Sequence, residues 1–279
     1  MDFNFSDDQE QLRDAVSKWV ERGYDFERRR GITAAGGFSR DAYNELAELG
    51  LTGLTLSEPL GGLGMGPVES MVVMEALGHG IVLEPLAQAL MAGVLLSNYA
   101  QPAVQQAWAG PLATGEALMV LATQERKNRY RLDQCTTQAE RQGDGWVLKG
   151  AKSVVPVADQ ADAFIVPAMA NGKLALFVVA RSAAGVSTTG YLTQDGGRAG
   201  ELTLQGAPAQ CLTEDGLTAL EHAVDVGIAA LSAEAIGVMD KTLAITVEYL
   251  NTRKQFGVTI ASFQALRHRV ADMKMQLEL

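Results

Sequence analysis

Cysteines are scarce in this sequence, and they are not arranged to hold a metal ion. The 279 residues contain only 2 cysteines, Cys135 and Cys211, and neither belongs to a CxxC pair or has Cys–His spacing. The three histidines, His79, His222 and His268, also lack metal-ligand spacing. A disulfide framework or a zinc site is therefore not expected. We predict no metal ligands.

Basic charge and long apolar runs are also limited. Lys and Arg number 23 against 33 Asp and Glu, which gives a net charge of −10 and a pI of about 4.9. Nucleic acids and anionic membranes are bound by clustered Lys and Arg, so neither partner is expected. The acidic N-terminus lacks the features of a signal peptide, and Asp225 and Glu234 interrupt the apolar run 224–239. We predict a cytoplasmic protein without a membrane span.

The first part of the chain has helical patterns. Ser6 and Gln9 have the spacing of a capping box, and Leu12, Val16, Trp19 and Val20 form one apolar stripe behind them. A second helix is predicted from Ser39, with Tyr43, Leu46 and Leu49 on its apolar face and a stop at Gly50. The glycine-rich stretch 51–66 predicts an ordered loop, and helices then continue to about residue 115.

Short strand-like runs follow between residues 116 and 215. They are separated by strong turn signals at Gly143-Asp-Gly145, Asn171-Gly172 and Asp195-Gly-Gly197. Strands without intervening helices predict an antiparallel barrel or sandwich. The runs are Leu118–Leu121, Trp146–Leu148, Phe164–Val166, Leu174–Val179 and Leu202–Leu204.

Helical patterns return from residue 216 to 279. The stretch Ala223–Asn251 is rich in Gly and Ala, which predicts a helix that is buried on most of its circumference. The last helix has no stop signal at its end, so we expect the natural protein to continue. The fold class is α+β, with an N-terminal helical domain (1–115), a β-domain (116–215) and the start of a C-terminal helical domain (216–279).

The stretch Arg253–Gln264 lies between two helical patterns, and its composition is unusual for a turn. It contains a guanidinium, two amides and two aromatic rings, which suit a large, flat ligand that carries phosphate. A plain helix–helix corner, in which Arg253 pairs with a nearby carboxylate, is an equally good reading of these residues.

Several segments together resemble the acyl-CoA dehydrogenase family over the entire chain. The most specific is Arg253-Lys-Gln-Phe-Gly with Phe263-Gln264; Gly61-Gly62-Leu63-Gly64, Glu75-Ala-Leu-Gly78 and the β segment 143–152 also match. Tyr24-Asp-Phe-Glu27, Thr193-Gln-Asp-Gly196 and Val247-Glu-Tyr-Leu250 are most similar to the small subunits of two-component pimeloyl-CoA dehydrogenases. The resemblance implies the family fold and FAD as the cofactor.

The resemblance also implies which residues bind FAD. Arg253, Gln255 and Phe256 would reach the nucleotide half of FAD in a neighbouring subunit, and Phe263 and Gln264 would line its adenine side. Two β segments would hold the flavin ring, through Leu121, Thr123, Gln124, Val154, Val155 and Pro156.

The chain departs from the family pattern at the ring. Val154 stands where the family has Trp, Pro156 where it has Thr, and Ile228 where it has Arg. No catalytic residue is predicted, because in most relatives the base lies beyond the end of this sequence. We interpret Glu125 as a solvated carboxylate, or one paired with Arg126, rather than as a base. Arg126, Lys127, Arg129 and Arg131 are interpreted as a solvated face, with a clamp for CoA phosphate or an acyl carboxylate as the alternative.

The resemblance implies an FAD-dependent oxidation of an acyl-CoA thioester to a 2,3-enoyl-CoA. The acyl group would be dicarboxylyl or otherwise bulky, and a flavoprotein would accept the electrons. The chain would form a homo- or heterotetramer with a related subunit. Two alternatives are a largely non-catalytic subunit that completes a partner's flavin site, and a flavin monooxygenase or nitroalkane-oxidase-like enzyme on the same fold.

Overall fold

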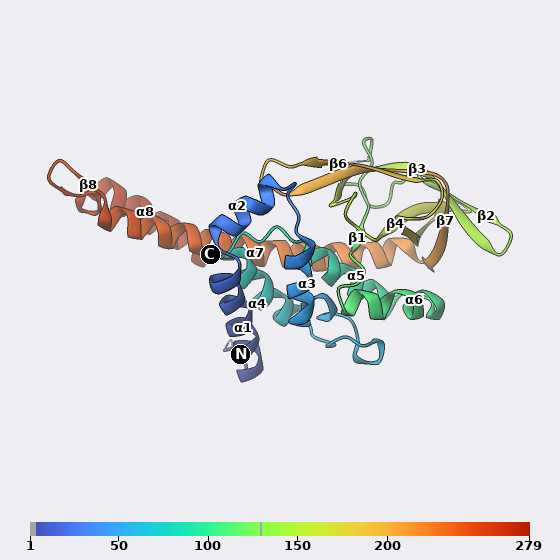
Figure 1. Ribbon diagram of the computed structural model, residues 1–279, viewed down its shortest axis with the longest axis horizontal. Helices are drawn as coiled ribbons and strands as arrows, with labels where there is room; N and C mark the ends of the chain where they lie inside the picture. The colour runs from blue at the N-terminus through green and yellow to red at the C-terminus, as the bar shows by residue number, and fades with distance from the viewer. Residues whose placement is uncertain (1–3, 129) are drawn as a thin grey trace. The chain divides into compact units, whose positions relative to one another are not determined.

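The computed structural model describes residues 4–128 and 130–279 (Figure 1). Helices come first, then strands, then helices again, which confirms the predicted α+β class. The chain divides into two compact units. One contains the residues up to Phe26 together with 71–82 and 231–279, and the other contains residues 27–70 and 83–230. The first helices are α1 (Asp7–Gly23), α2 (Phe26–Ala34), α3 (Arg40–Glu48), α4 (Pro67–Gly78), α5 (Leu86–Asn98) and α6 (Pro102–Ala113).

A closed circuit of strands forms the centre of the larger unit. Strand β4 pairs with both β2 and β5, and the pairings β2–β3, β3–β7 and β7–β5 complete a barrel, with β1 attached to β4 and β6 attached to β7. The strands are β1 (Met119–Leu121), β2 (Gln138–Gln142), β3 (Gly145–Pro156), β4 (Ala163–Ala170), β5 (Lys173–Ala180), β6 (Val186–Leu192) and β7 (Arg198–Thr213).

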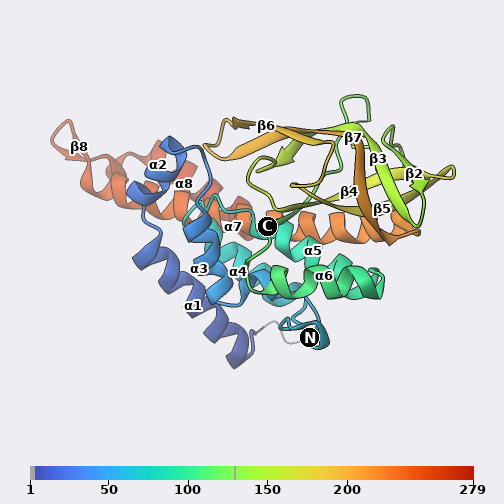
Figure 2. The same ribbon diagram turned by 45° about the vertical axis from the view of Figure 1, so that its right-hand side comes forward.

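The barrel confirms the predicted β architecture and corrects its details. Two pairings, β1–β4 and β2–β4, are parallel rather than antiparallel. Strands β2 and β6 were not predicted, because their residues are mostly polar and mostly exposed or half-buried. Trp146 and Phe177 meet edge to face inside the barrel, with their ring centroids 5.3 Å apart. Helices α5 and α6 lie on one side of the sheet in both views (Figures 1 and 2).

The predicted glycine-rich loop is ordered. It contains two short 3-10 helices, η1 (Leu51–Gly53) and η2 (Glu58–Leu60), and Gly64 donates its amide to Leu56 O at 2.8 Å. A Cβ atom on Gly62 would lie 2.1 Å from Leu56 O, so only glycine fits at this crossing. Helix α3 begins after Ser39 as predicted, but Leu49 is exposed rather than part of its apolar face.

The smaller unit contains α1, the end of α4, most of α7 (Gly216–Thr252) and α8 (Gln264–Glu278). The capping box of Ser6 and Gln9 is present. Helices α4 and α7 approach closely at two glycines: a Cβ atom on Gly237 would lie 2.0 Å from Glu75 O, and one on Gly78 would lie 2.2 Å from Glu234 O. The small residues of α7 therefore serve the close packing that the sequence predicted.

Helix α7 corrects two sequence-based expectations. Some of its small residues, such as Gly227, Ala230 and Gly237, are buried, but Ala229 is exposed. The apolar residues Ile228, Leu231, Met239 and Ile245 are exposed as well, so most of the circumference of α7 is not buried. By length and composition alone α7 could also cross a membrane, with a mean hydropathy of 1.4 over its most apolar 18 residues. Asp225 and Glu234 therefore did not exclude a span of that length, although a core helix of a soluble protein meets the same criterion.

Candidate functional site

The two segments predicted to hold a flavin ring lie side by side in the barrel. The first follows β1, where the Ala122 amide donates to Ile165 O at 2.9 Å. The second is the end of β3, and the Ser153 amide donates to Gln124 O at 2.8 Å. Residues that are about 30 positions apart in the sequence thus form one edge of the barrel.

The six predicted ring-contacting residues are not equally available at this edge. The side chains of Leu121 and Val155 are buried, with exposed fractions of 6% and 1%. These two residues can offer only backbone atoms to a ligand. Thr123 and Pro156 are half-buried, whereas Gln124 and Val154 are exposed.

Val154 has an unusual backbone conformation. Its φ is +54°, and the register between β3 and β7 shifts between Lys152 and Val155, which marks a bulge. A β-branched residue rarely adopts positive φ, because its side chain crowds the backbone. The bulge turns Val154 outward, so that its side chain is 51% exposed at the edge. Such strain is concentrated at functional sites.

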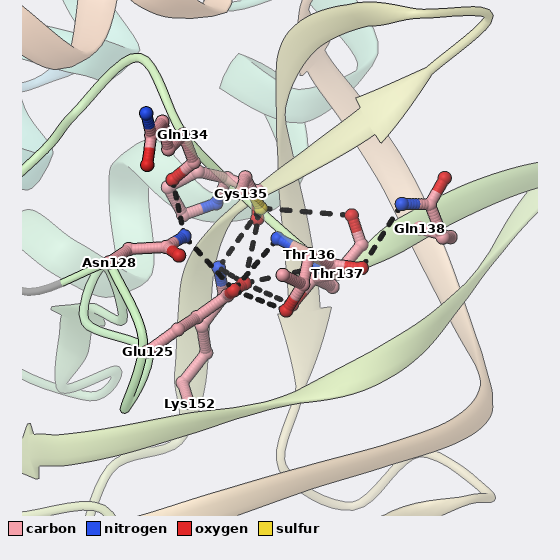
Figure 3. Close-up of polar contacts among 9 residues, drawn as sticks. Glu125, Asn128, Gln134, Cys135, Thr136, Thr137, Gln138 and Lys152 are labelled. Atoms are coloured by element: carbon pink, nitrogen blue, oxygen red, sulfur yellow. Dashed lines mark hydrogen bonds and ion pairs between the residues drawn. The ribbon is translucent and has the colours of Figure 1, made fainter.

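Glu125 is the next residue on the first segment. The sequence suggested that it is solvated or paired with Arg126, but in the structure it is buried. Its Oε1 atom lies 2.8 Å from Lys152 Nζ, and the two side chains are 4% and 0% exposed. The backbone amides of Thr136 and Thr137 donate to the same carboxylate at 2.7 and 3.0 Å. Figure 3 shows the Glu125 and Lys152 side chains meeting among Cys135, Thr136 and Thr137.

The surroundings keep Glu125 ionised. Burial alone would raise its pKa, but hydrogen bonds from Lys152, Thr136 and Thr137 outweigh burial and hold the pKa of this carboxyl far below its usual range. Every one of these partners favours the charged form. A general base must pick up a proton during turnover, so Glu125 is a structural anion and not the catalytic base.

Cys135 borders this ion pair without being activated by it. Its Sγ atom donates to Glu125 Oε1 at 3.2 Å and accepts from Lys152 Nζ at 3.4 Å. Burial, the largest effect, raises the pKa of the Cys135 thiol above its usual value despite the nearby ammonium. The thiol therefore stays protonated at neutral pH, which argues against a nucleophilic role.

Sequence reasoning missed Lys152, although a signal was present. Trp146, Leu148 and Lys152 occupy alternate positions of β3 and are all buried. The period of two places Lys152 on the inward face of the strand, where a charge requires a partner. Only the fold identifies that partner as Glu125.

The basic side chains that follow Glu125 in the sequence do not converge on one point. Arg126 lies 3.6 Å from Glu201 and Arg131 lies 2.7 Å from Asp133. Lys127 is exposed, and Arg129 lies outside the described residues. These placements match a solvated face, as the sequence suggested, more closely than a convergent clamp.

The stretch Arg253–Gln264 forms an exposed hairpin. Strands β8 (Lys254–Gln255) and β9 (Val258–Thr259) pair across Phe256 and Gly257, whose φ values are +52° and +82°. The Phe256 side chain is 92% exposed at the tip, and its ring lies 6.3 Å from that of Phe263. The hairpin thus presents an apolar ring to solvent at the cost of a strained backbone.

Arg253 and Gln264 have open donors in this hairpin. In the described part of the chain no carboxylate lies within ion-pair distance of Arg253. The alternative interpretation, a helix–helix corner in which Arg253 pairs with a carboxylate, is therefore wrong. Helix α8 begins at Gln264 without a side-chain cap. A guanidinium and an uncapped helix N-terminus are both suited to bind phosphate.

Comparisons with known proteins agree on one family. Residues 6–116 match the acyl-CoA dehydrogenase N-terminal domain, and residues 214–279 match the acyl-CoA dehydrogenase C-terminal domain. The chain belongs to the acyl-CoA dehydrogenase family. Its relatives are oxidoreductases, and the cofactor of the family is FAD.

Acyl-CoA dehydrogenase FadE27 of Mycobacterium tuberculosis is 34% identical, over 84% of this chain and 62% of the relative. The chain therefore spans less than two thirds of that relative's length. The solved ChsE4–ChsE5 complex from Mycobacterium tuberculosis contains a chain that is 29% identical to this one, with a TM-score of 0.87. The match covers 100% of this chain and 76% of the chain in that structure. The Tcur3481–Tcur3483 steroid acyl-CoA dehydrogenase variant is also 29% identical, with a TM-score of 0.88 and coverage of 97% and 74%.

The barrel edge fits the ring of FAD through its backbone. Three donors at this edge make no hydrogen bond to any acceptor among the described residues: the amides of Thr123 and Gln124 and the hydroxyl of Thr123. A flavin ring has two carbonyl oxygens and ring nitrogens that accept such donors. Pro156 has no N–H and cannot add a donor, so the first segment would make most of the polar contacts.

Proposed function

We propose that this chain is one subunit of an FAD-dependent acyl-CoA dehydrogenase that converts an acyl-CoA thioester to a 2,3-enoyl-CoA. The observation that carries the proposal is the hydrogen bond from the Ser153 amide to Gln124 O, which joins both ring-binding segments at an exposed edge. FAD, when bound, supplies the redox chemistry by accepting a hydride from the β-carbon. The chain's own contribution is binding and orientation.

Each part of the proposed site has a distinct task. The free amides of Thr123 and Gln124 would orient the ring, and the exposed side chain of Val154 would contact it. The buried pair of Glu125 and Lys152 would fix the first segment against β3. No residue of this chain is assigned as the catalytic base, since Glu125, the nearest carboxylate in sequence, is held ionised.

We further propose that the site is shared between subunits of a hetero-oligomer. The exposed hairpin with Arg253 and Phe256 has the donors and the apolar ring needed to reach the nucleotide half of a neighbour's FAD. The ChsE4–ChsE5 name of a similar structure denotes a complex of two different proteins, which supports a related partner subunit. The similarity to small subunits of pimeloyl-CoA dehydrogenases fits the same organisation.

The substrate and setting belong to the same proposal. A bulky acyl-CoA is favoured over a short one, because one of the similar structures is a steroid acyl-CoA dehydrogenase. A dicarboxylyl group is the other bulky class that the sequence suggests. We propose a cytoplasmic enzyme that passes its electrons to a separate flavoprotein.

The first test is the visible spectrum of the full-length protein, purified alone and with its partner subunit. Bound FAD should give a yellow protein that oxidises acyl-CoA in the presence of an artificial electron acceptor. A colourless protein in both preparations would refute the proposal.

A second test uses the hairpin. Arg253→Ala should lower the FAD content of the assembly several-fold, because a charge-assisted contact to phosphate is lost. Arg269→Ala on α8 is the matched control, as Arg269 is exposed outside the hairpin. Equal FAD contents in the two variants would contradict a role for Arg253 in binding.

A largely non-catalytic subunit is the second candidate function. It is favoured by Pro156, which removes a donor at the ring, and by the small side chain of Val154. In that case the assembly would contain one FAD per pair of different subunits, and Arg253→Ala would empty the partner's site. Two FAD molecules per pair would rule this candidate out.

A further inference from the structure

A tyrosine on strand β6 shares the surface of the proposed ring site. Tyr191 pairs with Ala199 of β7, and on its other side Ala199 pairs with Pro156 of β3. Directly paired residues in antiparallel strands point to the same face of the sheet. Tyr191 and Pro156 therefore flank Ala199 on one face, next to the bulge that exposes Val154.

Two charged side chains fix Tyr191 in this position. Its hydroxyl donates to Glu201 Oε1 at 3.4 Å, and Arg126 Nη2 lies 3.6 Å from Glu201 Oε2. Burial of the hydroxyl, together with the Glu201 carboxylate, raises the pKa of Tyr191, while the Val154 amide acts in the opposite direction. Tyr191 is thus neutral at pH 7.

Part of the Tyr191 residue remains accessible to solvent. It is 37% exposed, although its hydroxyl is engaged. A partly exposed tyrosine whose hydroxyl is held can offer a flat apolar surface at low entropic cost. Val154 offers only a small aliphatic surface beside it.

We propose that Tyr191 forms a wall of the flavin-ring site of this chain, and that Glu201 and Arg126 hold it in place. This inference rests on the proposed function. Tyr191 is a binding and positioning residue that contacts the ring through its aromatic face. Glu201 and Arg126 act through Tyr191 and make no contact with the ring themselves.

The test is a titration of FAD into flavin-free protein, in the assembly in which the chain purifies, for the wild type and three variants. Tyr191→Ala should weaken FAD binding about 2- to 10-fold, as expected for one lost aromatic contact. It should also raise the fluorescence of the bound flavin, because a neighbouring tyrosine quenches it. Tyr191→Phe keeps the ring but loses the hydroxyl that Glu201 holds, so its FAD affinity should lie between those of the wild type and Tyr191→Ala.

Leu192→Ala is the matched control. Leu192 follows Tyr191 on β6, is 55% exposed and points to the opposite face of the strand. Leu192→Ala should bind FAD with the same affinity as the wild type, and the fluorescence of its bound flavin should be equally low. Melting curves of all variants establish that each is folded.

The outcomes separate this inference from the proposed function. Wild-type protein that binds FAD, with Tyr191→Ala equal to Leu192→Ala in affinity and fluorescence, would overturn the role of Tyr191 alone. Wild-type protein that binds no FAD would overturn the ring site itself and the inference with it. A selective loss in Tyr191→Ala supports both.

Discussion

Replacing Lys152 with methionine removes the positive charge from a carboxylate that cannot reach water. Lys152 is fully buried and Glu125 is 4% exposed, and their charged atoms are 2.8 Å apart. Breaking a buried ion pair by removing one partner costs about 3–5 kcal/mol, because the remaining charge is left uncompensated. Methionine nearly preserves the volume of the side chain, so the loss reports charge rather than a cavity. We expect Lys152→Met to lower the free energy of unfolding by about that amount.

A double-mutant cycle separates the pair from its surroundings. Glu125→Gln alone leaves the Lys152 ammonium unpaired, whereas Glu125→Gln with Lys152→Met leaves no buried charge. The double variant should therefore lose about 1–3 kcal/mol less than the sum of the single losses. Urea unfolding at pH 7, followed by circular dichroism, gives the three values. Arg131→Ala, which breaks the exposed pair with Asp133, is the control and should leave stability unchanged.

The same pair predicts a pH dependence with a definite sign. The pKa of Glu125 is lowered in the folded protein, so its contribution to stability is complete above the ordinary carboxyl pKa and is lost as pH falls through the lowered value. Without Lys152 the largest cause of that lowering is gone. The stability difference between wild type and Lys152→Met should therefore be larger at pH 7 than at about pH 4. Additive losses in the cycle, or a difference that grows toward acid pH, would refute this account.

Two backbone substitutions give further predictions. Val154→Gly should leave the free energy of unfolding unchanged or raise it by up to about 1 kcal/mol, because glycine adopts positive φ without strain; a loss above about 1 kcal/mol in urea unfolding would show that Val154 is not strained. The buried neighbour Val155→Ala should cost about 2 kcal/mol in the same assay. Gly62→Ala should destabilise the protein by about 1–3 kcal/mol, since its Cβ would lie 2.1 Å from Leu56 O. Gly66→Ala is its control, with only the flexible Glu69 carboxylate 3.3 Å away, and equal losses in the two would contradict the close approach.

Local signals account for the elements that the sequence predicted well. The capping box of Ser6 and Gln9 and the cap at Ser39 involve residues three apart, so the sequence alone specifies them. The buried strands β4 and β5 are continuous apolar runs, which are recognisable without their partners. Strands β2 and β6 escaped prediction because their stability comes from pairing with β3 and β7, which lie elsewhere in the chain.

The sequence by itself determined the α+β class, the helix starts and the family resemblance of the Arg253–Gln264 hairpin and the two β segments. Each of these depends on residues that are close together in the chain or on a recognisable motif. Only the tertiary structure decided that Glu125 is buried against Lys152, that Val154 is turned outward by a bulge and that Tyr191 lies beside it. Those facts depend on strand register and on the closing of the barrel, which bring together residues 27 to 37 positions apart. A carboxylate is solvated or structural according to what the fold places around it.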